Sequence, residues 1–382
     1  MKKNTGYVCR TLQFSGLLML MMAIFLFAGC YPTQKRDTAE IAGSSVVSEE
    51  MEKAAVTQLK DVPQTVQEST ETTAIDAQVE IGNSSAKLTS LSGQGKQFSY
   101  DSIEKILSGG ESFSQNTGLP EQNVQAYQGS NGGLLTLGPG FISYISGRSS
   151  LKQYSLVLNS GLPMDDRYID NGVFTKGEIP GFDKQQTISR AKEWLREIGV
   201  EDVGEPKAAA LDYETLSEQY EKLDGDFPKD SEPFTPEDEG YYLVFRCEYD
   251  GIPFLAQNYV LTGKTQCSGS VIKMIVTRDG LQELYADGIY ELQENNETFD
   301  CIYDFNQIIR KAETKFQDVM LDEPVKINRI ELIYAPDVTS VNPITYKLSP
   351  CWVFYAASSS QSKSTDMFFY YSAITGEELG VE

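Results

Sequence analysis

Hydrophobic positions recur at helical spacing in two segments, residues 187–199 and 304–320. Such a stripe predicts an amphipathic helix with one face on a core. Thr187 and Asp304 are residue types that cap helix N-termini, and Gly199 is suited to end the first helix. The apolar stripes consist of Ile188, Ala191, Leu195 and Ile198 in the first helix, and of Phe305, Ile308, Ile309, Ala312, Phe316 and Val319 in the second. We therefore predict two helices that each cover one side of a sheet.

Alternating β-branched, aromatic and polar residues predict strands after each helix. The predicted strands are residues 241–249, 252–256 and 271–277 after the first helix, and 325–334, 346–356 and 367–373 after the second. Asp250 and Gly251 suit a type I′ hairpin turn, whose two central residues need positive φ. A helix followed by an antiparallel meander thus occurs twice. The predicted fold class is α+β, with tandem small domains that each pack a helix on a curled antiparallel sheet after a disordered tether.

Changes in composition divide the chain into five parts. We assign residues 1–29 to a signal peptide, 30–92 to a disordered tether rich in Ser, Thr and Glu, and 93–182 to an N-terminal α+β or β-rich domain. The two helix-plus-meander units then occupy residues 183–300 and 301–382. The tether is predicted because its few large apolar residues could not offset the entropy of ordering.

The N-terminal domain is the least regularly patterned part of the chain. A helix is expected at residues 101–107, and strands are expected at 134–137, 141–145 and 154–158 between Gly-rich turns. The pattern assigns no role to this domain.

The N-terminus has the pattern of an export signal. Basic residues precede an apolar run, residues 17–27, which is shorter than the roughly 20 residues that a membrane-spanning helix needs. Ala28, Gly29 and Cys30 after this run resemble a bacterial lipobox, with cleavage between Gly29 and Cys30. We predict a lipoprotein bound to membrane lipid through acylated Cys30, on the extracellular face of the cell membrane of a Gram-positive-type bacterium. An ordinary signal peptide with an incidental Cys30 is the alternative.

The chain is strongly acidic and contains no histidine. Its 32 Lys and Arg stand against 55 Asp and Glu, which gives a net charge of −23. Nucleic acid is not expected as a partner, because it is itself a polyanion. The lack of histidine excludes Ser-His-Asp and Cys-His catalysis and His-ligated zinc.

Other catalytic patterns are weak. Several Ser-x-x-Lys tetrads occur without the Lys-Thr-Gly that accompanies them in penicillin-recognising enzymes. The sequence has neither a P-loop nor a dinucleotide-binding glycine motif. We predict no enzyme activity and no cofactor.

An acidic insertion, residues 205–239, separates the first helix from its strands. Asp224, Asp226 and Asp230 are its weak candidates for a metal site, because carboxylate oxygens suit calcium. A solvated polar loop is the alternative. No other metal site is predicted.

Four cysteines follow Cys30, namely Cys247, Cys267, Cys301 and Cys351. An even number in an exported chain permits two disulfides in any of three pairings. Cysteine also packs as a small core hydrophobe, and Cys247 lies on the apolar side of a predicted strand. Both interpretations stay open.

The C-terminal hairpin concentrates aromatic side chains. They are Trp352, Phe354, Phe368, Phe369, Tyr370 and Tyr371. Alternation along a strand places rings on both faces of the sheet, and the helix at residues 304–320 can cover only one face. We predict that the other face binds a protein, since aromatic clusters concentrate binding energy. Burial against the neighbouring domain is the alternative.

Several segments resemble a known group of proteins. Residues 245–254 are similar to the strand-turn segment of the YycH/YycI regulatory proteins and of PepSY-type domains. Residues 349–354 and 369–377 resemble their closing hairpin, although Ser372 stands where asparagine is expected. YycI-like members keep a transmembrane helix, whereas this chain has a lipobox. The resemblance covers residues 183–382 and implies a non-catalytic protein that binds and restrains a membrane sensor kinase or a protease.

Together these features predict a non-catalytic extracellular lipoprotein. We expect a regulatory or scaffolding binder of another membrane or envelope protein, such as a membrane sensor kinase. The alternative is a binding module for a cell-wall polymer, a carbohydrate or a small solute. A deep pocket with convergent polar groups would favour the solute, and a broad exposed sheet face would favour the protein partner.

Overall fold

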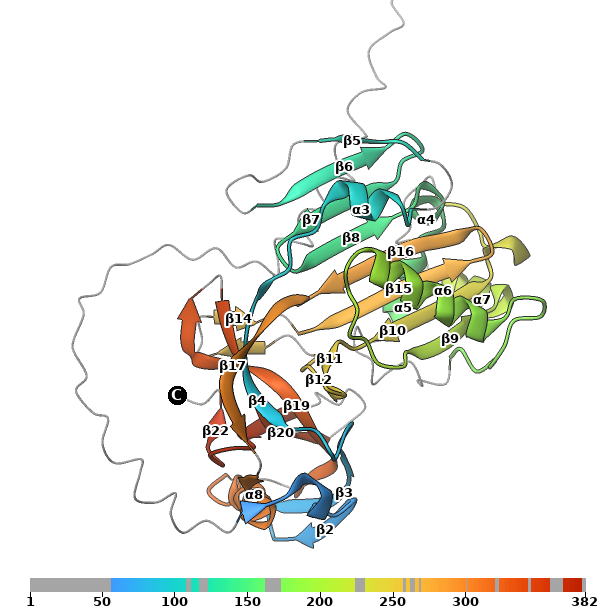
Figure 1. Ribbon diagram of the computed structural model, residues 1–382. Coiled ribbons are helices and arrows are strands. Elements are labelled where there is room, and N and C mark those ends of the chain that lie inside the picture. The colour runs from blue at the N-terminus through green and yellow to red at the C-terminus, as the bar shows by residue number, and fades with distance from the viewer. Residues whose placement is uncertain are drawn as a thin grey trace, which may run out of the picture. The chain divides into compact units, whose positions relative to one another are not determined.

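Strands that pair into two large sheets dominate the structure, a computed structural model shown in Figure 1. It describes residues 56–107, 111–116, 123–161, 173–223, 231–256, 259–261, 265–267, 269–299, 301–319, 323–342, 345–357 and 367–379. Among these residues, no helix is long and apolar enough to cross a membrane.

The first sheet has eight strands in the order β5-β6-β7-β8-β16-β15-β10-β9, and every neighbouring pair is antiparallel. Its strands are β5 (Phe113–Gln115), β6 (Gln125–Gly129), β7 (Leu134–Gly138), β8 (Phe141–Ile145), β9 (Lys207–Leu211), β10 (Gly240–Phe245), β15 (Val271–Thr277) and β16 (Gly280–Asp287). The sheet therefore joins strands that are more than a hundred residues apart in the sequence.

The second sheet has the order β17-β4-β20-β19-β3-β2, with β21 beside β20 and β22 beside β21. Its strands are β2 (Thr65–Ser69), β3 (Thr73–Glu80), β4 (Leu88–Gly95), β17 (Tyr290–Phe299), β19 (Val325–Asn342), β20 (Thr345–Ala357), β21 (Met367–Ser372) and β22 (Glu378–Leu379). Only the β19–β3 pair is parallel among the described pairs of this sheet.

Three further strand pairs are small. They are β1 (Val56–Thr57) with β18 (Ile302–Tyr303), β11 (Glu248–Tyr249) with β12 (Ile252–Pro253), and β13 (Tyr259–Leu261) with β14 (Thr265–Cys267). The β11–β12 turn is the one predicted, because Asp250 and Gly251 have φ of 49° and 73°.

The helices are short and mostly flank the sheets. They are α3 (Tyr100–Glu104), α4 (Gly147–Lys152), α5 (Tyr154–Gly161), α6 (Lys184–Glu197), α7 (Tyr213–Lys222) and α8 (Phe305–Thr314), with 3-10 turns η2 (Leu59–Asp61) and η5 (Pro236–Asp238). Asp304 caps α8 as predicted. Asp183, not Thr187, caps α6, since its carboxylate accepts the backbone N–H of Gln186 at 2.7 Å.

One apolar core contains side chains from both sheets and from both predicted helices. On the first sheet, α6 packs over β10 and β15 and contributes the buried Ile188 and Leu195. On the second, Phe305 of α8 packs edge-on against Trp352 of β20, with ring centroids 4.7 Å apart. The first predicted stripe is therefore confirmed as core-facing. The second is confirmed for Phe305, Ile308, Ile309 and Ala312. Its end is wrong, because α8 stops at Thr314, Phe316 is only partly buried and Val319 is exposed.

A buried ion pair also links the two sheets. Arg246, just after β10, pairs through Nη1 with Glu331 of β19 and donates from Nη2 to the carbonyl of Phe254 at 2.8 Å. The Tyr355 hydroxyl donates to the other carboxylate oxygen of Glu331 at 3.0 Å. Burial raises the pKa of Glu331, but attraction to Arg246 and Arg329 outweighs it and holds the pKa below its ordinary value.

The prediction of a disordered tether over residues 30–92 is wrong for residues 56–92. Within residues 30–92, the chain from 56 onward forms β1, η2, β2, β3 and the start of β4. Ile75, Ala77 and Val79 alternate with exposed polar residues along β3 and are buried in the core. Overall polarity concealed this period-two pattern, because Thr, Ser and Gln also suit the solvent side of a strand. Residues 30–55 lie outside the described part.

The predicted domain boundaries also differ from the observed sheets. Strands of the predicted domain 93–182 enter the sheet of residues 207–287 through the β8–β16 pair. Within the predicted unit 183–300, β17 pairs with β4 and so belongs to the second sheet. Composition could not show which strands share a sheet, because pairing between distant strands leaves no local signal in the sequence.

Two local predictions are corrected as well. Residues 154–158 begin helix α5 rather than a strand, and Tyr154, Val157 and Leu158 have the i, i+3, i+4 spacing of a helix face. The acidic stretch 205–239 is not a mere insertion, since it supplies edge strand β9 and helix α7. Its side chains Ala209, Leu211, Leu216 and Phe234 are buried in a second apolar cluster.

Candidate functional site

The aromatic side chains predicted to bind a partner are core residues instead. Trp352, Phe354, Phe369, Tyr370 and Tyr371 are between 0% and 7% exposed, and Phe368 is half-buried. The α8 face of the hairpin holds Trp352, Phe354, Phe369 and Tyr371. Tyr370 packs on the opposite face with Leu255 and Ile333. Leu255, which follows β12, packs on this second face, and Tyr370 there is buried, so the prediction of a free protein-binding surface there is wrong.

The cysteines with described side chains form no disulfide, which was one of the two possibilities that the sequence left open. Cys247, Cys301 and Cys351 are thiols. Cys247 and Cys351 are buried in different apolar clusters, and Cys301 is exposed. Burial raises the pKa of the Cys247 thiol to about 11. The side chain of Cys267 lies outside the described part.

The remaining predicted site residues lie outside the described part of the chain. These are Gly29 and Cys30 of the lipobox and the weak metal candidates Asp224, Asp226 and Asp230. Among the described residues, no group of three or more His, Cys, Asp or Glu is placed to hold a metal ion.

Strand register defines two rows of side chains across one face of the first sheet, which we call the outer face. Residues paired directly across antiparallel strands point to the same side. One row runs through Ser114, Gln128, Leu134, Ile145, Glu283, Ile275, Tyr242 and Ala209. The next runs through Ala126, Thr136, Ser143, Tyr285, Lys273 and Val244. Both rows cross from β6 to β10.

The two halves of this face have different surroundings. From β15 to β9, Val244, Ile275 and Ala209 are buried beneath side chains of α5 and α7. From β5 to β8, the outer-face side chains are exposed or half-buried. We call this second part the open half; it comprises Ser114, Ala126, Gln128, Leu134, Thr136, Phe141, Ser143 and Ile145.

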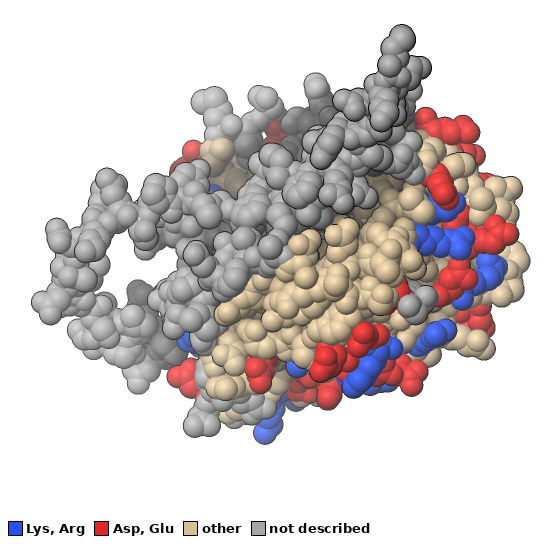
Figure 2. All heavy atoms as spheres, turned by 90° about the horizontal axis from the view of Figure 1, so that it is seen from above, with Lys and Arg blue, Asp and Glu red and all other residues tan. Residues whose placement is uncertain are grey.

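The open half carries no charged side chain, although the chain has a net charge of −23. Residues 123–147 contain no Asp, Glu, Lys or Arg. Figure 2 looks down on the end where Figure 1 draws β5 and β6, and it shows an uncharged area with acidic and basic side chains along its right and lower sides. Along each row from the β5–β6 end of the sheet, the first charged residue is Glu283 in the first row and Lys273 in the second.

A pocket of about 110 Å³ lies where the open half meets the covered half. Its lining includes Glu283, Lys273, Tyr242, Tyr285 and Ser143 of the sheet and Ser155 of α5. The hydroxyls of Ser149 and Ser155 each donate a hydrogen bond to one carboxylate oxygen of Glu283. Lys273 is only 8% exposed. Polar and charged groups from four strands and a helix thus converge on one small cavity.

The ionisable groups of this pocket are strongly affected by burial. Burial raises the pKa of the Glu283 carboxyl, and the two serine hydrogen bonds only partly oppose that rise. Burial likewise raises the pKa of Tyr242 and Tyr285. Tyr285 also donates to Asp287 at 3.2 Å, which favours the neutral phenol. The tyrosines therefore stay neutral near neutral pH and can donate hydrogen bonds.

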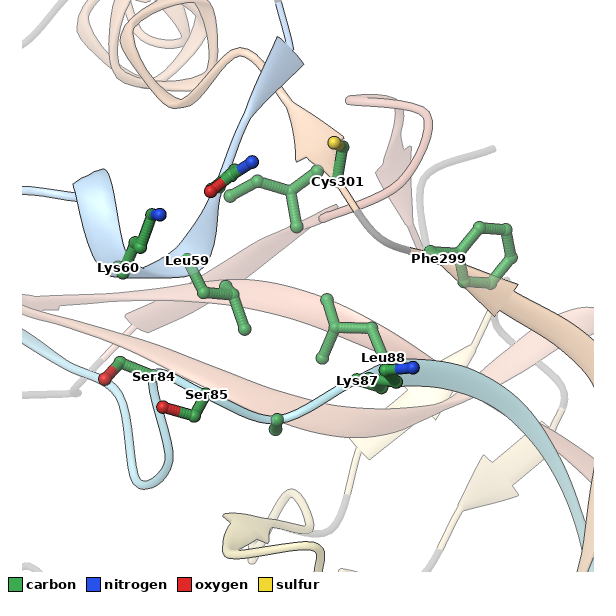
Figure 3. A pocket seen from close by; sticks show the side chains of 11 residues that line it. Leu59, Lys60, Ser84, Ser85, Lys87, Leu88, Phe299 and Cys301 are labelled. Carbon is green, nitrogen blue, oxygen red and sulfur yellow. The ribbon is translucent and has the colours of Figure 1, made fainter.

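A larger pocket of about 300 Å³ lies between η2 and the start of β4 (Figure 3). Leu59 and Leu88 line its middle, while Lys60 and Lys87 lie on opposite sides. Both lysines and the nearby Ser84 and Ser85 are exposed. Its polar groups do not converge, so the Glu283 pocket is the better candidate for specific recognition.

Sequence reasoning did not identify Glu283 or Lys273 as residues of a candidate site. One signal was present, because Lys273 is the only charged residue in the otherwise apolar segment Val271–Thr277. A lysine among buried positions points to a special environment. The convergence with Ser155 could not be foreseen, since it depends on how α5 crosses the sheet.

Comparisons with known proteins inform the fold and not the function. No protein-family model matches the chain, and no curated protein matches it. A similar solved structure is that of an uncharacterized protein from Eubacterium rectale, with a TM-score of 0.61 and 16% sequence identity. The match covers 85% of this chain and 96% of the other. The fold contains both helices and strands, with large sheets and few helices, which is consistent with the α+β class.

Proposed function

We propose that the chain is a non-catalytic, lipid-anchored extracellular protein that binds another membrane or envelope protein through the open half. The uncharged character of that surface is the observation that carries the proposal. Protein interfaces are depleted of charge at their centre, and Leu134, Phe141 and Ile145 supply half-buried apolar area there. Polar Gln128 and Thr136 beside them provide hydrogen-bonding groups for orientation.

The edge of the sheet supports the same proposal. Strand β5 is the end strand in the order of the sheet and pairs with β6 alone among the described strands. An edge strand presents backbone N–H and C=O groups to which an extended segment of a partner can add. A membrane sensor kinase with an extracellular part is the kind of partner that the resemblance to YycH/YycI proteins implies.

The proposal is tested by placing charge on the open half. We would change Gln128 and Thr136 together to arginine and capture partners by crosslinking in intact membranes. The matched control is Gln293→Arg, an exposed strand position in the second sheet. We expect the parent and the control to capture the same envelope protein, and the double variant to lose it without a change in melting temperature. Undiminished capture by the double variant would overturn the proposal.

The anchor is proposed separately and has its own test. We propose that Cys30 carries the lipid that holds the protein at the outer membrane surface. Cys30→Ala is expected to abolish acylation, and the protein should then stay as uncleaved precursor or appear in the medium. Mass spectrometry that finds acyl chains on the variant, or none on the parent, would contradict this.

We also propose that the chain contains tandem PepSY-like units. Helix α6 is followed by the meander β9-β10-β15-β16, and α8 is followed by β19-β20-β21-β22. Helix α6 packs over β10 and β15, the second and third strands of its meander, and α8 reaches β20, the second strand of its own, through the Phe305–Trp352 ring contact. An experimental structure should allow α6–β16 to superimpose on α8–β22. A helix that crosses different strands in the two units would contradict a common origin.

A further inference from the structure

The pocket between η2 and the start of β4 lies where two strand pairs meet. Strand β1 pairs with β18 through Thr57 and Ile302, and β4 pairs with β17 through Leu88 and Phe299. Ile302, Leu88 and Phe299 all line the pocket. Its apolar side chains are therefore held by paired strands, and the cavity does not depend on a single loop.

The charges in the lining of this pocket are all positive. Among the described lining residues, Lys60 of η2 and Lys87 just before β4 are the only charged side chains. Their sign is opposite to the net charge of −23 of the whole chain. Both are exposed, and neither forms an ion pair or a hydrogen bond with another described residue. The two ammonium groups are therefore available to an anionic ligand.

The two lysines are separated rather than convergent. They lie on opposite sides of the pocket, with Leu59 and Leu88 between them (Figure 3). A ligand with an anionic group at each end can use both amines, and its apolar middle can pack on the two leucines, which are 8% and 1% exposed. A volume of about 300 Å³ holds roughly ten non-hydrogen atoms, because one water takes up about 30 Å³.

We propose that this pocket binds a small, elongated dianion of the dicarboxylate class, with Lys60 at one end and Lys87 at the other. The exposed hydroxyls of Ser84 and Ser85 in the lining are further donors for a carboxylate. The pocket borders β4 of the second sheet, whereas the open half belongs to the first sheet. The inference is therefore independent of the proposed protein contact.

The experiment measures binding of adipate, a dicarboxylate of about this size, to the full chain by calorimetry at low ionic strength, because salt screens exposed charges. Hexanoate has the same carbon chain with one carboxylate, and the hexanediol with terminal hydroxyls has none. We expect adipate to bind saturably, hexanoate to bind about two- to fivefold more weakly, the scale of one exposed charge contact, and the diol not to bind. Equal binding of adipate and hexanoate, or no saturable binding of adipate, would overturn the proposal.

The thiol of Cys301 reports whether the ligand occupies this pocket. It is exposed and lines the pocket, whereas Cys247 and Cys351 are buried. We expect saturating adipate to slow the alkylation of Cys301 by iodoacetamide, followed by mass spectrometry of the peptide that contains it. An unchanged rate would place the ligand elsewhere and refute the assignment.

Two variants and one control test the two ends separately. Lys60→Gln and Lys87→Gln should each weaken adipate binding about two- to fivefold and remove its advantage over hexanoate. Both positions are exposed, so the melting temperature should stay that of the parent. Lys326→Gln, which removes an exposed lysine from β19, should bind adipate like the parent. A loss in only one of the two lysine variants, or an equal loss in the control, would refute a ligand held at both ends.

Discussion

At the scale of single residues, the Arg246–Glu331 pair is the contact whose removal has the clearest consequence. Both side chains are largely buried, with side-chain exposures of 15% and 6%. Glu331→Gln would remove the carboxylate charge that pairs with Arg246 in the interior. We expect the free energy of unfolding to fall by about 3–5 kcal/mol. Urea denaturation checks this, with Glu68→Gln on exposed β2 as a control that should change it by less than about 0.5 kcal/mol.

The same pair predicts a dependence on pH. The folded-state pKa of Glu331 is lowered, so the unfolded state binds more protons in the acidic range. Its contribution to stability is therefore full above the unfolded pKa and is lost as pH falls through the folded pKa. The melting temperature of the parent should drop on acidification below about pH 4.5 more steeply than that of Glu331→Gln. Equal slopes would show that other carboxylates dominate.

At the scale of elements, the β11–β12 hairpin depends on glycine at one position. Gly251 has φ of 73°, and an added Cβ would lie 3.0 Å from the Cβ of Asn83. Gly251→Ala should therefore destabilise the protein by about 1–2 kcal/mol. Gly177→Ala is the control, because nothing lies within 4 Å of its added Cβ. Thermal unfolding that ranks the two substitutions equally would contradict the strain argument.

Elements were predictable where their information is local. Both helices, the strands at 271–277 and 141–145 and the Asp250–Gly251 turn follow from periodicity and turn chemistry within a few residues. Segment 154–158 was misjudged because a five-residue apolar run fits a helix as well as a strand.

At the scale of the whole molecule, the N-terminal strands complete the second sheet. Strand β4 lies between β17 and β20, and β3 pairs in parallel with β19. A fragment of residues 183–382 would lack these strands and expose their partners' core positions. We expect it to show no cooperative thermal unfolding by circular dichroism, whereas residues 56–382 should unfold cooperatively. A cooperative transition in the short fragment would mean that the tandem units fold without β3 and β4.

The sequence by itself determined helices α6 and α8, the main strands that follow them, the hairpin turn and the acidic, histidine-free chemistry, since each depends on neighbouring residues or on composition. Only the tertiary structure decided which strands share a sheet, and with that which side chains are exposed. It buried Trp352 and Tyr370, and it brought Glu283 together with Ser149 and Ser155. The physical reason is that burial depends on contacts between segments far apart in the chain. An aromatic residue or a carboxylate has the same local signature whether a distant strand covers it or leaves it open.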